Sequence, residues 1–196
     1  STTTSGILAV LAMRSRALTG SGPVRLSSGR TTPLTMTATS GVLSCGVPRR
    51  ASPTATADPA DPDRSAALYE AELKSFYGAD TLDRGRPLFD LVLMGVGPDG
   101  HTASLFPGYP EVEETSRWVV GVPRANVEPF VPRVSLTLPT LASCREMLFE
   151  VAGADKRGIL TPVLAGENLP AGRAASIGET VWLVDQAALP GDFRGH

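Results

Sequence analysis

The chain has 196 residues, of which 42% are hydrophobic, and a net charge of −2. This length suits one ordinary domain with its own core, and the balance is typical of a globular protein. The near-neutral charge excludes nucleic acid or a membrane surface as the main partner, and no apolar run approaches the ~20 residues of a spanning helix.

The two cysteines, Cys45 and Cys144, lack CxxC spacing and indicate neither a disulfide framework nor a zinc site. We interpret Cys144 as a buried small hydrophobe rather than a nucleophile.

The first 57 residues differ in composition from the rest. They contain six Arg but no Asp, Glu, Lys or aromatic residue, whereas all 20 acidic residues follow from Asp58 onward. Composition therefore divides the chain into an atypical Ser/Thr/Arg-rich segment, 1–57, and an α/β domain, 58–196. Three hypotheses fit the first segment: a transit peptide, a stretch read out of frame, or a folded first βα unit with strands near Ile7 to Ala12 and from Val24.

From residue 58 the pattern becomes regular. Asp63 is expected to cap a helix that reaches Tyr77 and ends at Gly78, with Glu70 and Lys74 as an i,i+4 ion pair. Later runs predict, in chain order, a strand at 88–94, strands at 118–122 and 134–138, a short helix at 139–145, a strand at 147–152, a helix at 155–164 and a strand at 180–184. Strands that alternate with helices imply a layered α/β fold with a mostly parallel sheet flanked by helices.

The most informative stretch is LVLMGVGPDGHTASLFPG, from Leu91 to Gly108. A buried strand runs into a loop with Gly95, Gly97 and Gly100, and ligand crevices of open α/β sheets lie at the carboxyl ends of strands. The glycine amides, with a helix start near Thr102, are expected to form an anion cradle. The loop also fits GxGxxG, but dinucleotide binding is rejected because only residues 102–106 could form the helix that this motif must open.

His101 follows the glycines directly. On spacing alone, a loop histidine without a task is as good an interpretation as a catalytic one. Two facts favour catalysis: the only other histidine is His196, and imidazole is the side chain best suited to proton transfer near neutral pH. Asp99 could orient the ring, although a turn-forming role explains it somewhat better.

This stretch resembles the signature of the 6-phosphogluconolactonases. The match includes Pro98, Asp99, His101 and the Ser-Leu-Phe-Pro ending. Four later segments are similar to the family's pattern, so that the resemblance covers about residues 58–190: 132–139, 149–156, 169–173 and 181–188. The glucosamine-6-phosphate deaminases share a Gly-rich loop and a Gly-His pair but continue differently, so a deaminase-like sugar-phosphate enzyme is kept only as an alternative.

The resemblance implies hydrolysis of 6-phosphoglucono-δ-lactone to 6-phosphogluconate in the oxidative pentose phosphate pathway, without metal or cofactor. It implies His101 as the proton-transfer residue, supported by Asp99. Arg133 and Lys156 match basic positions of the family and are expected to bind phosphate, with Arg173 a weaker candidate. No GxSxG elbow and no cluster of metal ligands is present in the sequence. The expected substrate and phosphate contacts are Gly95, Gly97, Gly100, Thr102, Arg133, Lys156, Ser28 and Gly29.

The pattern departs from the family before residue 58. The segment from Leu26 to Pro33, LSSGRTTP, only loosely resembles the family's phosphate loop, and neither its Trp-Gly-Asp-Glu-Arg stretch nor its Ser-Asn-Tyr segment is found. The chain is therefore expected to lack about two βα units and to leave an edge and a face of the sheet uncovered. A non-catalytic or impaired remnant of the fold is the second hypothesis. A cytoplasmic location is expected, because no good signal peptide is found, and the chain is expected to be a monomer.

Overall fold

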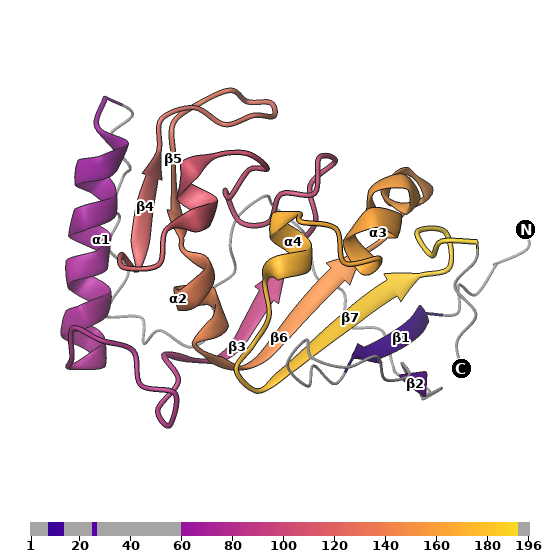
Figure 1. The fold of residues 1–196 in the computed structure, drawn as a ribbon, viewed down its shortest axis with the longest axis horizontal. Coiled ribbons are helices and arrows are strands. Elements are labelled where there is room, and N and C mark those ends of the chain that lie inside the picture. Colours follow the sequence, from indigo (N-terminus) through magenta and orange to yellow (C-terminus); the bar gives the residue numbers. More distant parts are fainter. Residues whose placement is uncertain (1–7, 14–24, 27–59, 192–196) are drawn as a thin grey trace, which may run out of the picture.

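The computed structural model describes residues 8–13, 25–26 and 60–191. The predicted phosphate contacts Ser28 and Gly29 lie outside the described residues. The main sheet has five strands in the order β2-β1-β7-β6-β3 (Figure 1). Their bounds are β1 Leu8–Met13, β2 Arg25–Leu26, β3 Phe89–Met94, β6 Cys144–Val151 and β7 Glu179–Asp185.

The centre of this sheet is parallel, as predicted. Strand β6 pairs in parallel with β3 on one side, where Val92 lies opposite Met147, and with β7 on the other. Strand β1 joins the free edge of β7 in the antiparallel direction, and β2 pairs antiparallel with β1. The strands expected at 118–122 and 134–138 form a separate antiparallel pair, β4 Val119–Val122 and β5 Arg133–Leu136.

Four helices and two 3₁₀ turns connect the described strands. The helices are α1 Pro62–Tyr77, α2 Leu138–Ala142, α3 Arg157–Leu164 and α4 Pro170–Arg173, and the 3₁₀ turns are η1 Pro110–Glu113 and η2 Ala154–Lys156. Helix α1 packs against the β4–β5 pair rather than against the main sheet (Figure 1). Within the described ranges, no helix combines the length and hydropathy needed to cross a membrane.

The predicted start of α1 was wrong by two residues. Asp61, not Asp63, is the N-cap, and its carboxylate accepts a hydrogen bond of 2.8 Å from the Arg64 N–H. Pro62 explains the choice, because proline fits the first helical position, where no N–H is needed. The helix ends as predicted at Gly78, whose left-handed backbone (φ 76°) and N–H to Lys74 carbonyl bond close the last turn.

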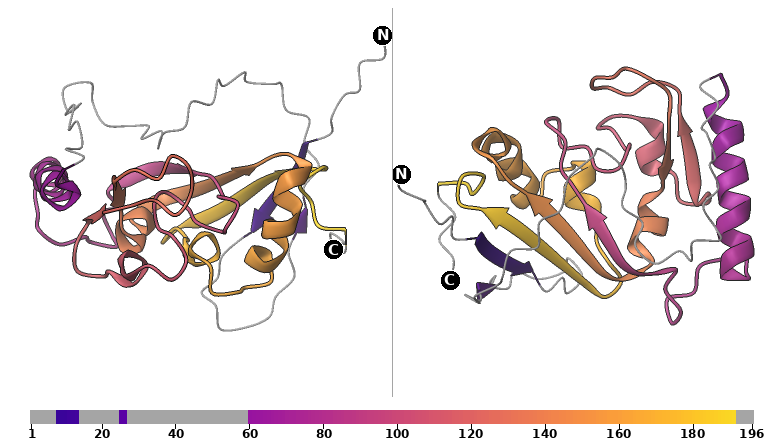
Figure 2. Two further views of the ribbon diagram at one scale, coloured as in Figure 1. Left: turned by 90° about the horizontal axis from the view of Figure 1, so that it is seen from above. Right: turned by 180° about the vertical axis from the view of Figure 1, so that it is seen from behind.

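The two faces of the sheet are buried to different extents. On one face, alternate residues of the parallel strands are almost fully buried: Val92, Met94, Met147, Phe149, Trp182 and Val184. Helices α3 and α4 lie together on one side of the sheet (Figure 2). Phe149 and Trp182 stack there at 3.9 Å between ring centroids. On the other face Leu148 and Val181 are only partly buried and Glu150 is exposed. The core therefore lies mainly on the side of the helices.

Two further element boundaries differ from the predictions. The short helix expected at 139–145 ends at Ala142, and β6 begins at Cys144, three residues earlier than predicted. The helix expected at 102–106 is absent; this stretch forms turns, with Ala103 in the left-handed region at φ 50°. Cys144 is fully buried, as expected of a small hydrophobe, and burial raises the pKa of its thiol.

Candidate active site

The glycine-rich loop lies at the carboxyl edge of the parallel strands. Strand β3 ends at Met94 and continues into residues 95–101, while the neighbouring β6 ends at Val151 and continues into the turn that carries Lys156. Because β3 and β6 are parallel neighbours, both connections leave the sheet at the same edge. The sheet therefore brings the 95–101 loop together with Lys156.

Hydrogen bonds within the loop hold its shape. The Gly97 N–H donates to the His101 carbonyl at 2.8 Å, and the Gly100 N–H donates to the Gly97 carbonyl at 3.0 Å. The Thr102 hydroxyl donates to the Gly95 carbonyl at 2.8 Å from a position only 1% exposed, so Thr102 closes the loop from inside. With the Gly97 and Gly100 amides occupied and no helix at 102, the expected cradle of backbone amides does not form from these groups.

Asp99 and His101 form a close pair. His101 Nδ1 lies 2.6 Å from Asp99 Oδ1, which also accepts the His101 N–H at 3.1 Å. Partial burial raises the pKa of the Asp99 carboxyl, but hydrogen bonds from the His101 ring and amide and from Asn126 outweigh it and leave that pKa below its ordinary value. An ionised carboxylate only accepts, so Nδ1 carries the proton, and in the neutral form of the ring the lone pair is on Nε2. This arrangement suits a general base.

The imidazole is held on two faces. A Cβ at Gly97 would lie 2.0 Å from the ring atoms Cε1 and Nδ1, so only glycine leaves room for the ring there. On another side the ring contacts Phe106, with 4.7 Å between centroids, and Phe106 is fully buried. The His101 side chain is 14% exposed, which leaves it reachable from solvent. Gly97 and Phe106 thus fix the position of the ring without covering it.

The connection between β4 and β5 supplies a residue that the sequence analysis missed. Asn126 Nδ2 donates to Asp99 Oδ2 at 3.2 Å, so that both carboxylate oxygens of Asp99 are engaged. Asn126 lies 27 residues from Asp99 along the chain. Nothing in the local sequence pattern marks it, because the contact depends on how the β4–β5 pair packs beside the loop.

Lys156 contacts the loop directly through its ammonium group. Its Nζ donates to the Val96 carbonyl at 3.0 Å, one residue before Gly97. The turn that presents it is fixed by the Lys156 N–H to Gly153 carbonyl bond and by the Gly153 N–H to Asp185 Oδ2 bond. An ammonium group has three donors, so two have no partner among the described residues and could bind an anion at this edge.

The two candidate arginines differ in how far they are engaged. Arg133 opens β5, and its Nη2 donates to the Pro129 carbonyl at 3.2 Å, while its buried Nε has no hydrogen-bond partner among the described residues. Arg173 forms a bidentate ion pair with Glu113, which fastens α4 to η1. Arg133 therefore keeps donor capacity for a ligand, whereas the guanidinium of Arg173 is already used.

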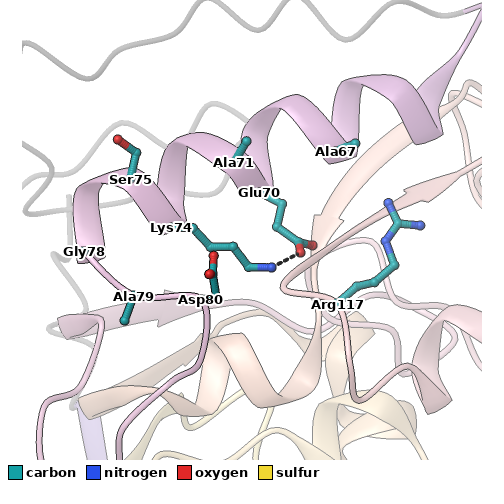
Figure 3. A pocket seen from close by; sticks show the side chains of 9 residues that line it. All are labelled: Ala67, Glu70, Ala71, Lys74, Ser75, Gly78, Ala79, Asp80 and Arg117. Carbon is teal, nitrogen blue, oxygen red and sulfur yellow. Dashed lines mark hydrogen bonds and ion pairs between the residues drawn. The ribbon is translucent and has the colours of Figure 1, made fainter.

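A hollow of about 610 Å³ lies elsewhere, along α1 (Figure 3). Figure 3 shows Glu70 and Lys74 pointing toward each other within it; Glu70 also accepts the Trp118 and Val119 N–H groups. Its charged groups thus bind α1 to β4, and none of its lining residues belongs to the 95–101 loop. Over the described ranges no group of three or more His, Cys, Asp or Glu could hold a metal ion.

Known proteins resemble the chain in sequence. The family model of glucosamine-6-phosphate isomerases/6-phosphogluconolactonase matches residues 35–182. A 6-phosphogluconolactonase of Streptomyces coelicolor is 40% identical over 131 residues, covering 65% of this chain and 49% of the relative. The one from Rattus norvegicus is 38% identical over 137 residues, covering 68% and 51%.

Solved structures give the same result. The 6-phosphogluconolactonase of Trypanosoma cruzi aligns with a TM-score of 0.56 at 28% identity, over 66% of this chain and 52% of that one. The one from Thermotoga maritima aligns with a TM-score of 0.51 at 34% identity, over 62% and 50%. The chain thus spans about half the length of the curated relatives it matches. Since the family model covers well over half of the present sequence, the chain belongs to the glucosamine-6-phosphate isomerase/6-phosphogluconolactonase family.

Proposed function

We propose that the chain hydrolyses 6-phosphoglucono-δ-lactone to 6-phosphogluconate, as a sugar-phosphate lactonase of the pentose phosphate pathway. One observation carries the proposal: Asp99 holds His101 at 2.6 Å through Nδ1, while Nε2 has no hydrogen-bond partner among the described residues and lies at the carboxyl edge of the sheet. The lactonase relatives support the same reaction class. The sequence after His101, Thr-Ala-Ser-Leu-Phe-Pro, favours the lactonase over the deaminase.

The chemistry needs one base that later serves as an acid. His101 Nε2 takes a proton from water as the water oxygen attacks the lactone carbonyl carbon, which gives a tetrahedral oxyanion. Asp99 stabilises the imidazolium that forms. The bond from that carbon to the ring oxygen then breaks, and Nε2 returns its proton to the departing oxygen. The products are a carboxylic acid, which ionises, and a hydroxyl group, so the imidazole is restored.

The phosphate end of the substrate requires cations. We assign it to Lys156, whose remaining ammonium donors lie beside the 95–101 loop, and to Arg133, whose Nε is buried without a partner among the described residues. Gly95, which has no atom within 4 Å of an added Cβ, leaves open space beside the loop. Gly97 serves by making room for the imidazole, and Gly100 packs against Leu169 of the α4 segment.

The test is hydrolysis of fresh 6-phosphogluconolactone by the full chain, measured as decay above the spontaneous rate, beside a His101→Ala variant. Activity lost in the variant is the expected result. Release of ammonia from glucosamine 6-phosphate instead would assign the deaminase reaction. No turnover of either substrate by the correctly folded chain would refute the proposal in favour of a non-catalytic remnant.

We further propose that the chain acts as a cytoplasmic monomer, without cofactor and without nucleic acid or membrane as partner. A doubly charged sugar phosphate does not cross membranes unaided, so its hydrolase is expected where the pathway runs. The net charge of −2 gives no attraction to nucleic acid. Sedimentation equilibrium measures the mass, and a value near 20.5 kDa is expected.

A further inference from the structure

The least expected contact at the site is the one between the β4–β5 connection and Asp99. Asp99 uses Oδ1 for His101 and Oδ2 for Asn126, whose side-chain amide donates at 3.2 Å. A carboxylate with a partner on one oxygen only can rotate about its terminal torsion, which is broad and soft. A donor on each oxygen fixes the plane of the group, and with it the direction in which Oδ1 faces Nδ1.

The backbone on both sides of Asn126 is anchored. Ala125, 1% exposed, packs with Phe106 and Val122 in a small apolar cluster, and Val127 packs against the same cluster. The Ala125 N–H also donates to the Val131 carbonyl at 3.0 Å, which ties the connection together. Asn126 is itself exposed, so its amide is presented from a fixed backbone although its own side chain is not buried.

These contacts form a closed circuit. Phe106, the centre of the cluster that anchors Asn126, also lies against the His101 ring at 4.7 Å. The contacts therefore lead from His101 through Asp99 to Asn126, and from the cluster beside Asn126 back to the His101 ring through Phe106. Because each member constrains the next, a change at Asn126 is expected to reach the imidazole through Asp99.

We infer that Asn126 is a positioning residue for the reacting imidazole: its amide holds Asp99 so that His101 keeps its proton on Nδ1 and its lone pair on Nε2. The inference concerns the tautomer of His101. Its expected effect on turnover rests on the proposed lactonase function. A neutral imidazole in water carries its proton mainly on Nε2, which is the wrong form for a base at that atom. The protein must therefore impose the reactive tautomer.

The test compares Asn126→Leu, which keeps the approximate shape but removes the donor, with Glu128→Gln, an exposed residue of the same connection. Asn126→Asp is the second variant, since it is isosteric and places an acceptor against Asp99. Long-range ¹H–¹⁵N spectra of the imidazoles at about pH 9, where an imidazole is neutral, report the tautomer. The chain has only two histidines, so His196→Gln suffices to assign His101.

We expect the Nδ1–H form of His101 to dominate in the unmodified chain and in Glu128→Gln, and the Nε2–H form to gain population in both Asn126 variants. In lactone hydrolysis, kcat should fall about tenfold for Asn126→Leu while KM stays within about threefold, because Asn126 does not contact substrate. An unchanged tautomer in both variants overturns the inference, as does an unchanged kcat where hydrolysis is measurable. The spectra need no turnover, so failure of the proposed function is read separately from failure of this assignment.

Discussion

Substitution of Gly97 by alanine tests whether the placement of the imidazole controls activity. A Cβ at this position would meet Cε1 and Nδ1 of His101 at 2.0 Å and Nε2 at 2.6 Å. Real Cβ atoms essentially never come closer than 3.0 Å to another atom, so the ring must retreat by 1.0 Å or more. The movement acts on the same ring that meets Asp99 at 2.6 Å, and it is expected to break that hydrogen bond.

The magnitude follows from that displacement. A misplacement of about 1 Å costs about 10² in rate when a reacting group depends on orientation. We therefore expect Gly97→Ala to lower kcat about a hundredfold. The free energy of unfolding should fall by only about 1 kcal/mol, the value of a ring contact such as that of His101 with Phe106. Gly97 is not in the left-handed region, so backbone strain adds nothing to this expectation.

The assay is the initial rate of lactone hydrolysis above the spontaneous rate, with urea unfolding measured on the same preparations. Gly158→Ala is the matched control, because Gly158 lies within α3, far from the loop in sequence, and an added Cβ there meets nothing within 4 Å. It should leave kcat unchanged and stabilise the helix by about 0.5–1 kcal/mol. A kcat within threefold of the unmodified chain for Gly97→Ala would refute the argument that the ring needs this space.

Three further predictions concern single charges. Asp99→Asn removes the attraction between the carboxylate and the imidazolium, which is about 4 kcal/mol at ~4 Å and is reduced to about 2 kcal/mol by partial exposure. The variant should therefore lower kcat about 30-fold or more and leave KM unchanged. Asp90→Asn, whose 90% exposed carboxylate pairs with Arg145, is its control and should retain full activity. Lys156→Met should raise KM for the phosphorylated lactone about tenfold with kcat nearly constant, and Lys156→Arg should recover part of that loss. Glu70→Gln should lower the unfolding free energy by about 1 kcal/mol at neutral pH, as measured by urea unfolding, because Glu70 bonds Lys74 and the Trp118 and Val119 amides.

The Glu70 prediction has a defined dependence on pH. Burial raises the pKa of this carboxyl, but Lys74 and the Trp118 and Val119 amides outweigh burial and lower the pKa below its ordinary value of 4.5. A group whose pKa is depressed on folding contributes stability above its unfolded pKa. The difference between the unmodified chain and Glu70→Gln should therefore be full above about pH 4.5 and should shrink as the pH falls through the lower, folded value. A difference that grows on acidification would contradict this assignment.

Local patterns in the sequence were enough to place most elements. The apolar runs of the parallel strands located β3 and β7 to within one residue, because strands buried in the middle of a sheet read as nearly continuous hydrophobic stretches. The predicted start of β6 was three residues late because Arg145 and Glu146, which follow its first residue Cys144, are exposed and interrupt the apolar run. The pairing of β4 with β5 outside the main sheet could not be predicted, since alternation reveals a buried face but not the partner strand.

In the candidate site too, local patterns could be predicted and contacts between distant elements could not. Asp99 and His101 became candidates through local signals: His101 follows a glycine-rich strand end, and the stretch that contains both residues resembles the lactonase signature. The helix expected at Thr102 failed because the Thr102 hydroxyl bonds back to Gly95 and the Leu105 N–H bonds to the Thr102 carbonyl, which together form a closed turn. Asn126 was missed because its role exists only once the β4–β5 connection has packed beside the loop.

At the proposed lactone end of the site, residues between 95 and 171 hold the loop and its histidine in place. The loop and its histidine are held by Asp99, Asn126 and Phe106. The α4 segment adds a hydrogen bond from the Ala171 N–H to the Gly100 carbonyl.

The phosphate end rests on Lys156 and Arg133, two charge-assisted contacts worth at least about 1.5 kcal/mol each. Hydrolysis of 6-phosphogluconolactone should therefore exceed that of the unphosphorylated lactone by about 10² in kcat/KM. A preference beyond about 10⁴ would require phosphate contacts outside the described residues, where Ser28 and Gly29 lie. A preference near unity would contradict the assignment of Lys156 and Arg133 to the phosphate.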